Sequence, residues 1–269
     1  MLKENKHSQY SKDIYSKVLE YISDDECVSD EVLKIGLVGS VNDDESVDTW
    51  SDLDILFILK CDATGNIKTN TLLRLRELNK KISSIFADVE ISFLTHTYDD
   101  LEKYVSFGYL ENYKFASFDV DNDFVNFTEY IDQIVEKRGI TDLIRKRYTI
   151  YHLRHFRFNL IRKVLLIRDT KGAIKQIVDK IIETMILVSI YNDENIKGKK
   201  DRLSLIRELV DDQDVLSIYE ESFKNREQWA EISFVEDDLG IWLDKFIKIE
   251  NYLLEKHMED TPEELININ

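Results

Sequence analysis

The sequence predicts an α+β protein, in which a mixed sheet with flanking helices is followed by a bundle of helices. Three short segments rich in β-branched and aromatic residues lie within the first hundred residues, at 32–40, 52–59 and 87–95. From about residue 140 onward, apolar residues recur almost entirely at helical spacing. We therefore expect one domain over residues 1–135 and a helical domain over residues 140–260.

The elements of the first domain follow from their hydrophobic periodicity. Tyr15, Val18 and Ile22 form one stripe of an amphipathic helix. The segment VLKIGLVGS is apolar and β-branched and runs into Gly39-Ser40, while ADVEISFLT alternates as a strand does. The expected elements are a helix at 10–30, strands at 32–40 and 52–59, a helix at 69–86, a strand at 87–95, and one or two further strands with an irregular connection within 96–135.

The second domain is predicted to consist of long helices separated by short polar breaks. Gly172, Gly198 and Gly240 lie at those breaks, which suits helix termini. Helices of this length favour a bundle. They are expected at 141–168, 172–192, 201–222 and 239–258.

Composition and charge limit the classes of partner. The net charge of −17 disfavours nucleic acid, although residues 137–175 carry twelve basic and two acidic side chains, a local charge of +10 that leaves −27 for the remainder. No apolar run approaches the roughly 18 residues that a membrane span needs. Two isolated cysteines, Cys27 and Cys61, form no metal-ligand spacing and fit a reducing compartment, and no secretory signal is visible. A cytoplasmic protein without a membrane partner is expected.

A pair of carboxylates opens the second predicted strand. Asp52 and Asp54 are two positions apart, so on a strand they project from one face with Cα atoms about 7 Å apart. Mg²⁺ suits such a pair, because it binds protein through one or two carboxylates together with substrate phosphates. The third strand supplies a further acid, for which we favour Glu90, expected deeper in that strand, while Asp88 stays open.

A phosphate cradle is predicted beside these acids. Gly39 lets the backbone approach a ligand closely, and the Ser40 hydroxyl with nearby N–H groups can hold a phosphate. A cradle and a carboxylate cluster holding two Mg²⁺ ions are the parts needed for in-line attack on the α-phosphate of a nucleotide, with pyrophosphate leaving.

These residues resemble the nucleotidyltransferase superfamily related to DNA polymerase β. The likeness rests on Gly39-Ser40, eleven intervening residues, Asp52-Leu53-Asp54 and a later strand bearing Glu90, and it covers roughly residues 30–95. It implies that Asp52 and Asp54 bind both metal ions, that Glu90 binds the catalytic one, and that Gly39 and Ser40 contact the triphosphate.

A helical second domain is similar to that of minimal and antibiotic-modifying nucleotidyltransferases. The resemblance then implies a Mg²⁺-dependent adenylyltransferase that moves a nucleoside monophosphate to a hydroxyl of a small molecule, with AMP from ATP expected. The implied acceptor is an antibiotic such as an aminoglycoside or lincosamide, and the implied role is antibiotic resistance. The acidic surface outside residues 137–175 favours a cationic acceptor. The resemblance also allows a homodimer.

Three other interpretations remain open. The acceptor can be a hydroxyl on a protein, as in antitoxin-type enzymes that attach AMP to a partner protein. Asp52, Asp54 and Glu90 can hold Mg–NTP without catalysis, as in a nucleotide-binding regulator. They can also be the ordinary polar edge of two strands.

Overall fold

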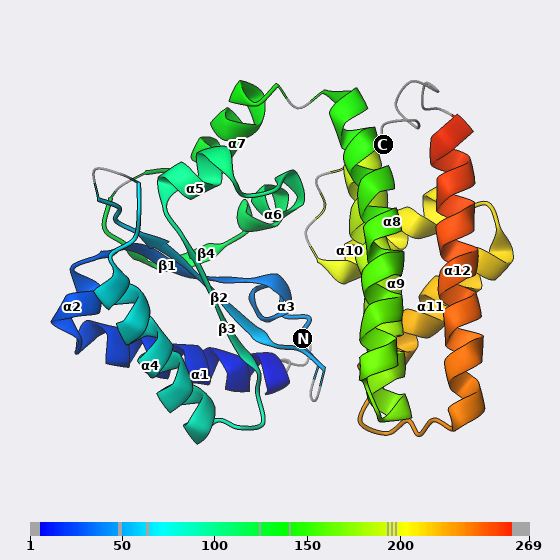
Figure 1. Ribbon diagram of the computed structural model, residues 1–269, viewed down its shortest axis with the longest axis horizontal. Coiled ribbons are helices and arrows are strands. Elements are labelled where there is room, and N and C mark those ends of the chain that lie inside the picture. The colour runs from blue at the N-terminus through cyan, green and yellow to red at the C-terminus, as the bar shows by residue number, and fades with distance from the viewer. Residues whose placement is uncertain are drawn as a thin grey trace, which may run out of the picture. The chain divides into compact units, whose positions relative to one another are not determined.

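The computed structural model describes residues 6–47, 50–62, 65–123, 125–139, 141–192, 194, 196 and 198–259. The chain divides into two compact units, residues 1–138 and 139–269. The first contains a four-stranded mixed sheet and the second consists of helices (Figure 1). Among the described helices, none has both the length and the apolar character needed to cross a membrane.

The sheet has the strand order β3-β2-β1-β4. Strands β1 and β2 pair antiparallel, as do β1 and β4, whereas β2 and β3 pair parallel. A parallel pair needs a crossover, and α4 (Thr69–Ile85) supplies it. The strands are β1 (Val32–Val38), β2 (Leu53–Leu59), β3 (Ile91–His96) and β4 (Ser117–Asp121).

Helices cover both faces of the sheet. One hydrophobic cluster joins α1 (Lys6–Ser23) and α4 (Thr69–Ile85) to alternate residues of β2 such as Leu53 and Ile55. The intervening Leu56 and Ile58 belong to a second cluster on the other face, formed with the helices that follow β3. The alternation of β2 therefore determines which face each of its side chains meets.

The expected helix at 10–30 is wrong in its second half. Helix α1 ends at Ser23, and the four-residue α2 (Glu26–Ser29) follows. Asp25 begins the new turn, since its carbonyl accepts hydrogen bonds from the Val28 and Ser29 amides at 2.9 Å. Aspartate competes with helical backbone bonding and so favours helix ends.

The described residues 96–123 and 125–135 contain one strand, β4, as expected, and also parts of three helices that were not expected. Thr97 and Asp100 form a capping box at the start of α5, and the Asn126 side chain caps α7. Such short helices depend on their caps and on tertiary packing more than on a long apolar stripe. They are α5 (Tyr98–Lys103), α6 (Phe107–Tyr113) and α7 (Phe127–Lys137).

The second unit is organised around α9, which contacts α8, α10, α11 and α12. The expected helix at 201–222 is wrong, because two helices occupy this stretch. The Asp212 carboxylate accepts bonds from two amides of the new helix and so caps it. The helices are α8 (Asp142–Leu166), α9 (Thr170–Tyr191), α10 (Lys199–Leu209), α11 (Gln213–Glu227) and α12 (Glu236–Glu259).

Candidate functional site

Gly39 and Ser40 lie where β1 ends, in the short helical turn α3 (Gly39–Asn42). Gly39 adopts φ +71°, a conformation that favours glycine, and a Cβ added there would lie 3.2 Å from Asp54 Oδ2. Ser40 is buried, and its carbonyl accepts a bond from the Glu45 amide at 2.8 Å. A side chain at position 39 would therefore crowd the Asp54 carboxylate.

Asp52 and Asp54 flank the first residue of β2. Asp52 is exposed and immediately precedes the strand, while Asp54 is half-buried and pairs with Val38 of β1. Because Leu53 and Ile55 point toward α1 and α4, Asp54 points to the opposite face. On that face it lies near Tyr113 of α6, whose pKa is raised by burial and further by the charges of Tyr109 and Asp54.

Glu90 does not lie inside the third strand as expected. Strand β3 begins at Ile91, because residues 86–89 form the turn that connects α4 to the sheet, with the Val89 amide bonded to the Phe86 carbonyl. Glu90 is exposed immediately before the strand, and its carbonyl accepts a bond from the Leu53 amide at 2.8 Å. In the parallel register Leu53 pairs with Ile91, so the register continued by one residue sets Glu90 beside Asp52.

Asp88 has a different neighbour. The Tyr10 hydroxyl of α1 donates to its carboxylate at 3.2 Å. Helix α1 packs on the face of the sheet that Asp54 does not share. This contact holds the Asp88 carboxylate beside α1.

The sequence-predicted residues thus gather at one end of the sheet. This end contains the carboxyl end of β1 and the amino ends of β2 and β3. Carboxylate oxygens are the donors that Mg²⁺ prefers, so the chemistry of the residues fits that ion. As placed, however, no group of three or more His, Cys, Asp or Glu side chains within the described ranges is close enough together to hold a metal ion.

Tyr113, which lies near Asp54, and its neighbour His96 were not found by sequence reasoning. His96 Nε2 lies 3.0 Å from the hydroxyl of Tyr113, and their rings are 5.5 Å apart. The alternation of β3 put His96 on the face of Ser92, which pairs with Asp54. Tyr113 was missed because α6 was not predicted, since a helix of seven residues gives too little periodicity to be recognised.

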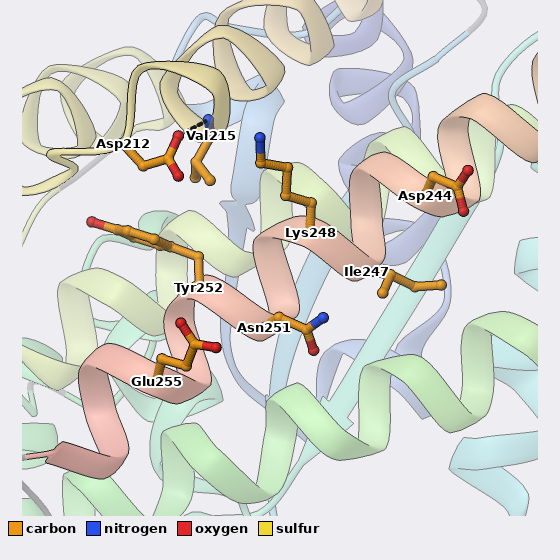
Figure 2. Close-up of a pocket in the computed structure, with 8 residues that line it drawn as sticks. All are labelled: Asp212, Val215, Asp244, Ile247, Lys248, Asn251, Tyr252 and Glu255. Atoms are coloured by element: carbon orange, nitrogen blue, oxygen red, sulfur yellow. Dashed lines mark hydrogen bonds between the residues drawn. The ribbon is translucent and has the colours of Figure 1, made fainter.

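A surface pocket of about 380 Å³ occurs elsewhere, in the second unit between α11 and α12 (Figure 2). Figure 2 shows Asp212 bonded to the Val215 amide, and Lys248 pairs with Asp214 at 2.6 Å. These polar groups cap a helix and join two helices. The pocket is lined by Asp212, Val215, Asp244, Ile247, Lys248, Asn251, Tyr252 and Glu255.

Comparison with known proteins does not assign the chain to a family. No protein-family model matches the sequence, and no curated protein matches it. The functional interpretation therefore depends on the residues themselves.

Proposed function

We propose that this protein is a Mg²⁺-dependent nucleotidyltransferase that moves a nucleoside monophosphate, with AMP from ATP expected, to a hydroxyl of a small molecule and releases pyrophosphate. The observation that carries the proposal is the strand register, which sets Asp52, Asp54 and Glu90 at the start of two neighbouring parallel strands. The close approach of Gly39 to Asp54 at the same end of the sheet supports it.

Each residue has a role in this proposal. Asp52, Asp54 and Glu90 would hold Mg²⁺, which supplies positive charge to the triphosphate when bound. Gly39 has no side chain to displace the Asp54 carboxylate, and Ser40 follows it in the same turn, where both would contact the triphosphate. The acceptor oxygen forms a bond to the α-phosphorus, the bond to the bridging oxygen of pyrophosphate breaks, and the acceptor proton passes to a base.

The acceptor class follows from charge and from the resemblance to antibiotic-modifying enzymes. Outside residues 137–175 the chain carries −27, which attracts polycations such as aminoglycosides. Lincosamides and protein hydroxyl groups are the other acceptors to compare.

A nucleotide-binding regulator is the second candidate, and one observation favours it. The described side chains do not form a ready cluster of three metal-binding groups. A pair of carboxylates can hold Mg–NTP through the phosphates without arranging two ions for catalysis.

The test is pyrophosphate release in the presence of Mg²⁺, with each common ribonucleoside triphosphate and a panel of aminoglycosides, lincosamides and a protein acceptor. Asp54→Asn should lower the rate at least about a hundredfold, because charge stabilisation by a bound metal contributes several kcal/mol. Glu90→Gln should do the same, while Asp88→Asn from the same turn serves as its matched control.

The outcomes separate the candidates. Acceptor-dependent release that disappears in Asp54→Asn supports the transferase. Nucleotide binding without release with any acceptor supports the regulator. A protein that binds no nucleotide rejects the site altogether, and loss of release in Asp88→Asn rather than Glu90→Gln makes Asp88 the third acid.

A further inference from the structure

Helix α8 exposes one long apolar face. The helix packs on α9 and α12 through residues such as Leu153 and Leu160, which are buried. At about 100° per residue, its exposed apolar side chains all fall within an arc of about 140°. Tyr151 and Phe158 lie at the middle of this arc and are 62% and 67% exposed. The apolar members of the α8 face are Leu143, Ile144, Tyr151, Phe158, Ile161 and Leu166.

The same face carries arginines. Arg147, Arg154 and Arg162 are exposed on this arc, whereas Asp142, at the start of the helix, is the one acid in the α8 sequence. Arg154 lies 3.7 Å from the fully buried Glu250 of α12, which offsets its charge. Aromatic residues and arginine are the side chains enriched in protein–protein interfaces.

The side chains of the α8 face follow a two-fold pattern. Residues equally far from the midpoint between Arg154 and His155 are alike in character: Leu143 matches Leu166, Arg147 matches Arg162, and Tyr151 matches Phe158. An interface with two-fold symmetry requires a surface that is complementary to itself, in which residue i meets residue j and j meets i. The α8 face has this property when two copies run antiparallel.

We propose that the chain forms a homodimer in which two copies of α8 pack antiparallel, with Tyr151 of each copy against Phe158 of the other. The exposed parts of the six apolar side chains amount to roughly 700 Å² per copy if a full side chain exposes about 200 Å². A standard interface buries about 800 Å² per partner. The estimate lies within the range of about 600–1,000 Å² per partner that standard interfaces cover.

The apolar side chains of the α8 face favour a second copy over nucleic acid. The aliphatic residues at both ends of the α8 face gain nothing from a phosphate backbone, and the net charge of −17 repels it. A second copy covers these residues with their own counterparts, since Leu143 meets Leu166. This proposal does not depend on the proposed enzymatic activity.

Sedimentation equilibrium of the full chain over a wide concentration range tests the dimer. Tyr151→Asp and Phe158→Asp should each weaken the association at least about tenfold, because each buries a charge twice in one interface. Tyr104→Asp is the matched control, since Tyr104 is also exposed but lies in the first unit. Circular dichroism checks that every variant is folded.

Charge reversal tests the antiparallel register. The dimer sets Arg147 opposite Arg162 twice, so Arg147→Glu alone or Arg162→Glu alone should tighten association by replacing repulsion with two ion pairs. The double variant should lose that gain, because acids then face acids. If Arg147 and Arg162 did not face each other across the interface, the double variant would not lose the gain of the single variants.

The results that overturn the proposal are specific. A monomer at every concentration, or a dimer unaffected by Tyr151→Asp and Phe158→Asp, rejects the α8 face as a self-association surface. Additive effects of the two charge reversals reject the register. If the protein is a monomer that binds a fluorescein-labelled single-stranded oligonucleotide, and Tyr151→Asp abolishes that binding, the α8 face is a nucleic-acid-binding surface instead.

Discussion

Replacing Lys34 with methionine should destabilise the first unit through a buried charge cluster. The Lys34 side chain is fully buried in β1, and its ammonium contacts Asp121 of β4 and, at 2.8 Å, Asp123. Asp123 is only 13% exposed and also accepts bonds from the Tyr98 hydroxyl and the Val125 amide. Methionine fills most of the lysine volume, so the change removes charge without leaving a large cavity.

The magnitude can be worked from burial. Breaking a buried ion pair costs about 3–5 kcal/mol, whereas the half-exposed contact with Asp121 contributes at most about 1 kcal/mol. We expect Lys34→Met to lower the free energy of unfolding by about 3 kcal/mol and Asp123→Asn by about 2 kcal/mol. The double variant should lose about 2 kcal/mol less than the two separate losses together, because neither charge is then left unpaired.

The pH dependence follows from the same contacts. Burial raises the pKa of Asp123, but the bonds from Lys34 and Tyr98 outweigh it and hold that pKa below its ordinary value. The stability contributed by this group is therefore complete above about pH 3.9 and is lost as the pH falls through the lower folded-state pKa. Lys34→Met removes the largest contribution that lowers this pKa, so it should make the acid-dependent loss smaller.

Urea unfolding followed by circular dichroism measures the changes, and hydrogen exchange at the amides of β1 and β4 locates them. Lys17→Met, which removes an exposed lysine paired with Glu20, is the control and should leave the midpoint unchanged. Losses of Lys34→Met and Asp123→Asn that simply add would refute the reasoning, because they would show that the two charges do not stabilise one another.

Three further changes have defined outcomes. Gly36→Ala should cost about 3 kcal/mol in urea unfolding, since the new Cβ would meet the Ser117 carbonyl oxygen at 2.5 Å; a neutral effect would mean that β4 shifts freely. Gly39→Ala should cost about 1–2 kcal/mol from its positive φ and should lower pyrophosphate release further by displacing the Asp54 carboxylate; unchanged release would count against the cradle. Burial, and then the charge of His155, hold the pKa of His152 below its ordinary value. The stability that neutral His152 contributes is therefore complete above about pH 6.5 and declines as the pH falls below it. Thermal unfolding of His152→Gln should show a flatter decline between pH 7 and pH 5, and an unchanged slope would contradict this account.

The first sheet elements were predictable because their sequence carries the relevant signal. Strands β1 and β2 are apolar runs between polar loops, and α4 has a clear helical stripe, so all three occur where expected. Helices α5 and α6 have only six and seven residues, too few for periodicity to stand out, and they are held by caps and by packing on the sheet.

The candidate site was predictable in its residue types but not in its detail. Local spacing brought Asp52 and Asp54 together, and the strand pattern brought in Glu90. Alternation alone could not show that Glu90 precedes β3, because a turn and a strand can share the same sequence pattern over three residues. The proximity of Tyr113 to Asp54 comes from tertiary packing, to which no short motif corresponds.

Strand β2 lies between the candidate site at its first residues and Cys61, a cysteine to which a fluorophore can be attached. From Leu53 to Leu59 the strand spans about 20 Å at about 3.3 Å per residue. Cys61, an exposed free cysteine, follows at the far end. A fluorophore on this thiol would be carried by the strand that bears Asp54 while leaving the carboxylates clear. The length of the strand thus sets the spacing between such a fluorophore and Asp54, against which distances to a labelled nucleotide can be measured.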